Sequence, residues 1–366
     1  MSRSALLYFS LCGIITASVW YWYNNDKENS KVEECHAPFL NETKTEKAIL
    51  RKLLSSNNRI VSSPFFKILQ RKLDFHIDKL CSEATGLCFN IIDTYEMQSD
   101  RLFAYRGLRS EGSGSILLLS AARLLPPRPM NWENFNSKGW KVYKKSVKLN
   151  YARMMIAGSF FSGALDYDFK DVQNVLVIGL GGGIINNYFS SMDRLQLNVT
   201  VVDNDPVMKK IAEKWYELET TPMQRIVVDD GIRFIREANR KGEIYDVLLI
   251  DVCYNEHRDL MAPIEEFMVD EEIKQMSKIL KPDGAVIVNI VTRPETVDEA
   301  DRVHFVYSRH FPSCYFMHFG KYDKMLFCSK KVKNSWLDNA DELRERFKRI
   351  DRELEFDLTE SGTEKN

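Results

Sequence analysis

A run of glycines and a following aspartate stand at the spacing that a nucleoside-binding site requires. The stretch 174–183 reads NVLVIGLGGG, so an apolar segment passes directly into Gly179, Gly181, Gly182 and Gly183. Because glycine carries no side chain, a glycine turn between a buried strand and a helix lets the backbone approach a ligand closely. The next apolar segment ends on Asp203, where a carboxylate can hold the hydroxyl pair of a ribose. For the glycines alone, a tight turn without a ligand is the alternative.

Further acidic residues end the next two predicted strands. Residues 226–228 run into Asp229 and Asp230, and residues 246–250 run into Asp251. In open α/β sheets, ligands bind at the carboxyl ends of the strands. Asp229 and Asp230 therefore stand where a carboxylate could recognise an adenine, and Asp251 stands at the mouth of the following strand. Together these positions predict a nucleoside pocket.

A doubly wound, Rossmann-like α/β sheet is needed to bring these residues together. Apolar runs without helical periodicity predict buried strands between residues 172 and 329. Short β-type runs separated by glycines predict a small β-domain over residues 86–130, and residues 149–161 predict a helix before the main sheet.

We expect five segments along the chain. They are a hydrophobic segment (1–25), a polar helical stalk with amphipathic helices over 46–54 and 64–80 (26–85), the small β-domain (86–130), the main α/β domain (142–330) and a charged tail with an exposed helix over 336–356 (331–366).

The motifs VLVIGLGGG, VVDNDP, VVDDGIRFI, YDVLLIDV and LKPDGAVIVNIV resemble those of class I S-adenosylmethionine-dependent methyltransferases with the spermidine synthase-like fold. Within that branch, residues 87–330 are most similar to the carboxyl-terminal domain of the methyltransferase-like 13 family, which methylates translation elongation factor 1-alpha. The resemblance implies S-adenosylmethionine as the cofactor and methyl transfer to an amine on a protein. It also implies a homodimer, because dimers are common in this fold.

The resemblance also implies roles for individual residues. The glycine loop would cradle the methionine part of the cofactor, Asp203 would bind the ribose and Asp230 would face the adenine amine. Asp251 would line the reaction centre and, with Tyr151 from the helix over the pocket and with Tyr254, would position the acceptor nitrogen.

Departures from the resembled families leave two alternatives open. Spermidine synthases carry acids where Tyr254 and Arg153 stand here, and a diamine substrate needs carboxylates to neutralise it. Aminopropyl transfer is therefore the less favoured enzymatic reading. The related methyltransferases carry a second acid where Cys253 stands, so a catalytically silent, membrane-tethered scaffold with the same fold is the other alternative.

The amino-terminal part of the chain predicts targeting to a membrane. The stretch from Ala5 to Tyr23 holds no charged residue and ends in WYWY, which is typical of a membrane span with an interfacial aromatic belt. Arg3 precedes it, so the positive-inside tendency places the part of the chain that follows this stretch, here called the body, in the lumen of the secretory pathway. A cleaved signal peptide, with secretion of the body, is the alternative.

The remaining features are consistent with a lumenal body or exclude other classes. Six cysteines follow Cys12, an even number that suits an oxidising lumen, although fifteen pairings are possible. We expect Cys253, Cys314 and Cys328 to be buried thiols, and Asn41 opens a glycosylation sequon. The net charge of −1 in 366 residues gives no electrostatic argument for nucleic-acid binding, and the histidines show no metal-ligand spacing.

Overall fold

The computed structural model describes residues 73–98, 101–112, 115–127, 134, 136–319, 323–331 and 340–358. The predicted membrane segment, the sequon at Asn41 and the predicted helix over 46–54 lie outside these residues. Over the described part of the chain, none of the helices has the length and apolar character to span a membrane.

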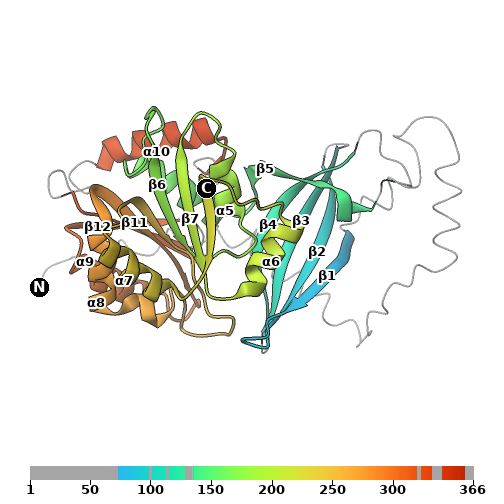
Figure 1. The fold of residues 1–366 in the computed structure, drawn as a ribbon, viewed down its shortest axis with the longest axis horizontal. Coiled ribbons are helices and arrows are strands. Elements are labelled where there is room, and N and C mark those ends of the chain that lie inside the picture. The colour runs from blue at the N-terminus through green and yellow to red at the C-terminus, as the bar shows by residue number, and fades with distance from the viewer. Residues whose placement is uncertain are drawn as a thin grey trace, which may run out of the picture.

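The first part of the fold is a five-stranded antiparallel sheet (Figure 1). Its strands follow one another in chain order: β1 (Leu73–Cys81), β2 (Cys88–Gln98), β3 (Arg101–Gly112), β4 (Ser115–Leu125) and β5 (Lys141–Val147). Alternate residues such as Phe89, Ile91 and Tyr95 are buried on one face, as period-2 side-chain geometry requires. The predicted small β-domain is present, and it is larger than the range 86–130.

The predicted helix over 64–80 is wrong from Leu73 onward, because these residues form β1. Leu73, Phe75 and Ile77 alternate with Asp74 and His76, which is a strand pattern. The pairing of β1 with β2 then decides the outcome, since tertiary pairing overrides weak local propensity.

The second part is a mixed eight-stranded sheet with the order β12-β13-β11-β9-β6-β7-β8, to which β10 adds by pairing with β11. The parallel strands are β6 (Gln173–Ile178), β7 (Leu197–Asp203), β8 (Gln224–Val228), β9 (Tyr245–Ile250) and β11 (Leu280–Thr292). The antiparallel strands are β10 (Leu260–Ala262), β12 (Ser313–His318) and β13 (Asp323–Ser329). The predicted α/β class with a preceding β-sheet is confirmed.

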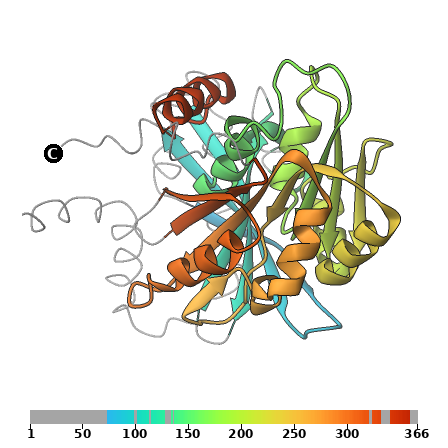
Figure 2. The ribbon, with the colours of Figure 1, turned by 90° about the vertical axis from the view of Figure 1, so that its left-hand side faces the viewer.

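Helices cover both faces of this sheet. One face packs against α4 (Asn150–Phe161), α5 (Ile184–Ser190) and α6 (Pro206–Trp215). The other packs against α7 (Gly231–Lys241), α8 (Asp270–Lys278) and α9 (Glu299–Ser308), the yellow and orange helices of Figure 2. Because chain order reverses between β6 and β9, the topological switch point lies where Gly179 and Asp251 leave the sheet, at the edge where such folds bind ligands.

The tail helix α10 (Ala340–Leu354) is not the exposed helix that its charges predict. It packs on α4, and Ile350, Leu354 and Phe356 are buried. The interleaved acids and bases conceal an apolar stripe at spacings of three and four residues, which is the pattern of a helix with one buried face.

A buried ion pair ties the two sheets together. Arg106 on β3 donates from Nε and Nη2 to the two carboxylate oxygens of Asp93, each at 2.8 Å. The same guanidinium donates to the carbonyl oxygens of Trp215 at 3.0 Å and Ser137 at 2.8 Å. Trp215 ends α6, so this pair of the first sheet fixes a helix of the second.

Two disulfides correct the expectation of buried thiols. Cys314 bonds to Cys328, and Cys81 bonds to Cys88. Each pair occupies directly opposed positions of antiparallel neighbours, which brings the Cα atoms to 4.2 and 4.0 Å respectively. Cys253 carries a free thiol, but this residue is exposed and not buried as expected.

Candidate functional site

The glycine loop has a backbone that other residues adopt only with strain. Gly179, Gly181 and Gly183 have φ angles of +99°, +51° and +72°, in the left-handed region that favours glycine. A Cβ at Gly179 would lie 2.0 Å from the carbonyl oxygen of Asp251. The loop therefore brings bare backbone against the end of β9, and Gly183 serves as the N-cap position of α5.

Asp203 ends β7 beside this loop. Its carboxylate oxygens accept hydrogen bonds from the N–H groups of Leu180 at 2.8 Å and Asp205 at 2.9 Å. Burial raises the pKa of Asp203 to about 6, although these two backbone donors act in the opposite direction. The structure thus brings together the glycine loop and Asp203, as the sequence predicts.

Asp229 and Asp230 follow β8 at the same edge. The N–H of Asp229 donates to the carbonyl oxygen of Asp203 at 3.0 Å, so the two strand ends are adjacent. Asp230 caps α7 by accepting from the N–H of Arg233 at 2.7 Å, and the Asp229 carboxylate pairs with the Arg233 guanidinium. Both side chains thus have local partners, and their contact with an adenine stays a prediction.

Asp251 and Tyr151 are the residues predicted to line the reaction centre. Asp251 accepts a hydrogen bond from Asn289 Nδ2 at 3.2 Å, and burial raises its pKa to about 6, aided by the charge of Asp203. Tyr151 donates its hydroxyl to the carbonyl oxygen of Leu119 at 2.9 Å. Burial and the Asp251 charge raise the pKa of Tyr151 well above its usual value.

Two residues of this site were not predicted from the sequence. Asn289 is buried in β11, and its Oδ1 has no hydrogen-bond partner among the described residues. The only signal was a polar residue inside the apolar run 285–291. Ser120 on β4 accepts from the N–H of Gly182 at 2.8 Å, and a Cβ on Gly182 would lie 2.9 Å from the Ser120 Cβ. The first sheet therefore forms one wall of the glycine loop.

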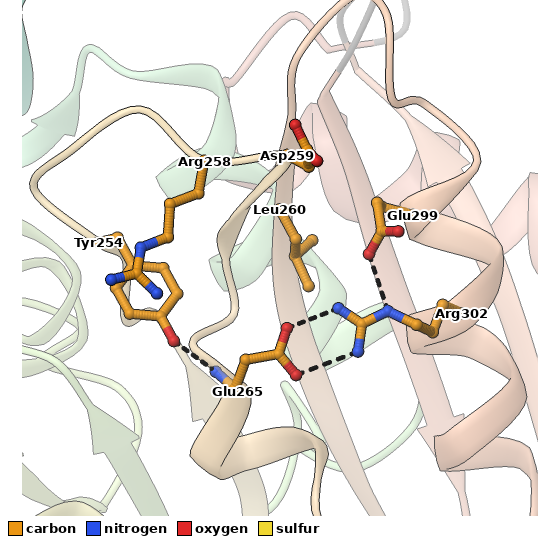
Figure 3. Close-up of a pocket in the computed structure, with 7 residues that line it drawn as sticks. All are labelled: Tyr254, Arg258, Asp259, Leu260, Glu265, Glu299 and Arg302. Carbon is orange, nitrogen blue, oxygen red and sulfur yellow. Dashed lines mark hydrogen bonds and ion pairs between the residues drawn. The ribbon is translucent and has the colours of Figure 1, made fainter.

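Tyr254 lines a cavity together with Arg258, Asp259 and Leu260 (Figure 3). Its hydroxyl accepts from the backbone N–H of Glu265 at 3.1 Å, and the guanidinium of Arg258 stands 3.8 Å from its ring centroid. This cavity of about 310 Å³ is also lined by Glu299 and Arg302. The glycine loop, Asp203 and Asp251 are not among the residues that line this cavity, and the role of Tyr254 at the reaction centre stays a prediction.

A second cavity, of about 350 Å³, lies near the first residues of β7 and β8. These are the amino ends of the strands, at the edge of the sheet opposite to the predicted nucleoside pocket. Within the ranges that the structure describes, His, Cys, Asp and Glu form no group of three or more that could hold a metal ion.

Comparisons with known proteins agree with this fold. No family model matches the sequence. An eEF1A lysine and N-terminal methyltransferase homolog of Drosophila pseudoobscura pseudoobscura is 33% identical over 133 residues, which cover 35% of this chain and 19% of the relative. A polyamine aminopropyltransferase of Vibrio vulnificus is 26% identical over 42% of this chain and 47% of its own length. The chain thus spans about a fifth of the length of the first of these relatives and about half of the second.

Two solved structures share the fold. Human methyltransferase-like protein 13 in complex with SAH superposes with a TM-score of 0.51 and 24% identity, covering 57% of this chain and 93% of that one. A probable spermidine synthase from Corynebacterium glutamicum superposes with a TM-score of 0.51 and 14% identity, covering 76% of this chain and 93% of that one. The chain is therefore similar in sequence to the eEF1A methyltransferases and has the class I methyltransferase fold that spermidine synthases share.

Proposed function

We propose that this chain binds S-adenosylmethionine at the glycine loop and transfers the methyl group to an amine of a protein. The carrying observation is the contact between the glycine loop and the end of β9. There a Cβ at Gly179 would lie 2.0 Å from the Asp251 carbonyl oxygen, so that bare backbone faces the sheet edge where Asp203 and Asp251 stand. This edge is where the fold binds its ligands.

The residues at this edge fit a nucleoside cofactor. Asp203 as a whole residue is partly exposed, and its carboxylate accepts two backbone hydrogen bonds, so lone pairs remain for ribose hydroxyl groups. The glycine loop would hold the methionine part, and Asp229 and Asp230 stand at the strand end that would face the adenine. The sequence similarity to methyltransferases and the shared fold with a neighbour solved in complex with SAH support this assignment.

When bound, S-adenosylmethionine supplies an electrophilic methyl group on its sulfonium. The chain's own contribution is to align the acceptor nitrogen and to exclude water. Asp251, held by Asn289, can accept an N–H hydrogen bond from the amine. With a pKa of about 6, Asp251 is largely ionised at neutral pH and can stabilise the positive charge that the nitrogen gains. The Tyr151 hydroxyl donates a hydrogen bond to the carbonyl oxygen of Leu119 and retains lone pairs that can accept a second N–H.

Aminopropyl transfer has less support. Tyr254 stands where spermidine synthases carry their second acid, and its hydroxyl accepts a hydrogen bond from the backbone N–H of Glu265. Arg153 donates from Nε to the carbonyl oxygen of Val147 at 2.6 Å and from Nη1 to that of Phe356 at 3.0 Å. Neither residue supplies a carboxylate for a diamine, so the aminopropyl reaction would have to depend on Asp251.

Titration calorimetry tests the proposal. The chain from about residue 24 onward is titrated with S-adenosylmethionine and with its decarboxylated form, and both titrations are repeated with Asp203→Ala. Asp193→Ala is the matched control, because Asp193 is an exposed aspartate that pairs with Lys145 away from this edge. Micromolar binding of S-adenosylmethionine that Asp203→Ala removes and Asp193→Ala retains supports the proposal. A preference for the decarboxylated form favours aminopropyl transfer, and no binding of either leaves the silent scaffold.

Attachment to a membrane through the stretch 5–23, and assembly as a homodimer, remain part of the proposal and are supported by the sequence and the resemblance alone. Carbonate extraction of membranes from cells that produce the full chain tests the first. Sedimentation equilibrium of the chain from residue 24 onward tests the second.

A further inference from the structure

Four of the described cysteines are paired, and both pairs are set by strand register. Cys81 and Cys88 face each other where β1 passes into β2, and Cys314 and Cys328 face each other on β12 and β13. The Cα separations of 4.0 and 4.2 Å are slightly shorter than the range of about 4.4–6.8 Å that disulfides usually span. One pair belongs to each sheet, so the two bonds are independent features of the fold.

The two pairs differ in how deeply their cysteines are buried, and this shows which of them could act as packing thiols instead of forming a bond. Cys328 is fully buried and could pack as a thiol, whereas Cys81 is exposed and Cys88 is only partly buried. An exposed thiol contributes little to a core and is open to oxidation. The first pair therefore serves the molecule as a bond.

We infer that this chain folds and works in an oxidising compartment, enclosed by a membrane or outside the cell, and that its methyl acceptor is a protein exposed there. The claim about the compartment rests on the two cysteine pairs. The claim about the acceptor also rests on the proposed function. Cytosolic thiols are kept reduced, whereas disulfides persist in secretory and extracellular compartments. A chain of this size has enough core to fold without such bonds, so two opposed pairs have little use in a reducing environment.

Each bond forms by thiol–disulfide exchange with an oxidised dithiol protein, the class of oxidant that such compartments hold. The two thiols of a pair lose two protons and two electrons and form the S–S bond. The oxidant's disulfide takes up both electrons and both protons and leaves as a dithiol.

The remaining described cysteine is compatible with that environment. Cys253 stands two residues after Asp251, and although part of its surface is exposed, the protein around its thiol raises the pKa to about 12. The charges of Asp251 and Asp203 act in the same direction. Because exchange proceeds through the thiolate, the free thiol beside the reaction centre resists mixed-disulfide formation.

This inference gives the acceptor a class that differs from the one in the relatives' names. Translation elongation factor 1-alpha works in the cytosol, where a body held in an oxidising lumen does not meet it. The uncharged stretch from Ala5 to Tyr23 independently predicts that the body crosses a membrane. The acceptor is then an amine, on a lysine or at an amino terminus, of a secretory or extracellular protein.

Differential thiol labelling of the full chain in eukaryotic cells tests the compartment. Cells are quenched with acid, free thiols are blocked with light N-ethylmaleimide, and the protein is reduced and labelled with the deuterated reagent before peptide mass spectrometry. We expect at least tenfold more heavy than light label on Cys81, Cys88, Cys314 and Cys328, and light label on Cys253. In a variant lacking residues 1–25, which stays in the cytosol, we expect light label on all of them. Light label on the four cysteines of the full chain overturns the inference, and so does heavy label in both proteins.

Radiolabelled methyl transfer tests the acceptor class. Lumenal and cytosolic proteins of the same cells are each treated beforehand with unlabelled cofactor. The purified full chain is then incubated with tritiated S-adenosylmethionine and with one of these fractions. Parallel incubations with an irrelevant protein in place of the chain give the background. Label on lumenal proteins supports the inference. Label confined to cytosolic proteins overturns the acceptor class and leaves the methyltransferase intact. If neither fraction is labelled and calorimetry shows no cofactor binding, the proposed function itself fails, while the thiol labelling still decides the compartment.

Discussion

Removing the guanidinium of Arg106 should destabilise the protein more than the loss of any surface ion pair. Arg106 and Asp93 expose only 3% and 0% of their side chains, and the guanidinium makes hydrogen bonds to Asp93, Trp215 and Ser137. In Arg106→Met the Asp93 carboxylate stays buried without its partner. Breaking a buried pair in this way costs about 3–5 kcal/mol, which corresponds to a fall in melting temperature of about 6–20 °C for a fold of this size.

The assay is urea unfolding followed by tryptophan fluorescence, and Lys79→Met is the matched control. Lys79 pairs with Glu111 at 2.8 Å, but the two side chains are 44% and 47% exposed. An exposed pair is worth about 1 kcal/mol or less, so the control should shift the midpoint little.

A double variant separates the ion pair from simple loss of packing. Arg106→Met with Asp93→Leu removes both charges, and replacing a buried pair by apolar residues is often close to neutral. We expect it to recover more than half of the stability that the single variant loses. If Arg106→Met is no more destabilising than Lys79→Met, or if the double variant is as unstable as the single one, the argument that Arg106 compensates a buried carboxylate is refuted.

Three further predictions concern the cofactor edge. Gly179→Ala should abolish binding of S-adenosylmethionine in calorimetry, because its Cβ would lie 2.0 Å from the Asp251 carbonyl oxygen; binding within threefold of the unmodified chain would contradict this. Ser120→Ala should lower the free energy of unfolding in urea by about 1–2 kcal/mol, since it leaves the buried Gly182 N–H unpaired, and an unchanged free energy would show that this hydrogen bond does not support the loop. The pKa of Asp203 is raised from 3.8 to about 6, so its protonation stabilises the cofactor-free fold, fully below pH 3.8, and this stability is lost as pH rises through 6. Urea unfolding from pH 7 down to pH 4.5 should therefore show the unmodified chain gaining stability relative to Asp203→Asn, and parallel curves would contradict the shift.

The parts of the fold that could be predicted from the sequence are those where local pattern and tertiary role agree. Strands β6, β7 and β9 are buried on both faces, so their sequences are largely apolar; β7 ends on Asp203, and β6 and β9 are followed directly by Gly179 and Asp251 at the ligand edge. That agreement made Gly179, Asp203 and Asp251 predictable.

The errors occurred where a local pattern had two readings. The segment before Cys81 alternates polar and apolar residues but also carries enough charge to resemble a helix, and only its pairing with β2 decides between them. The stripe of α10 that contains Ile350 and Leu354 is masked by acids and bases whose spacing also suits an exposed helix. Disulfide pairing depends on strand register, which the spacing of cysteines does not reveal.

Ser120 and Arg106 could not be identified from the sequence, because their contacts join the two sheets. In the sequence, Ser120 is one serine in an apolar run. Its role is visible only in the fold, where β4 packs against the glycine loop and the Ser120 hydroxyl accepts a hydrogen bond from the N–H of Gly182. The sequence does not distinguish Arg106 from the other arginines. Its role is visible only in the fold, where it donates a hydrogen bond from β3 to the carbonyl oxygen of Trp215 at the end of α6. Because one of these contacts supports the loop and the other holds the helix that follows Asp203, the small β-sheet is part of the proposed cofactor site. The shape of the pocket therefore depends on how the two sheets pack, and this packing is not encoded in any single motif.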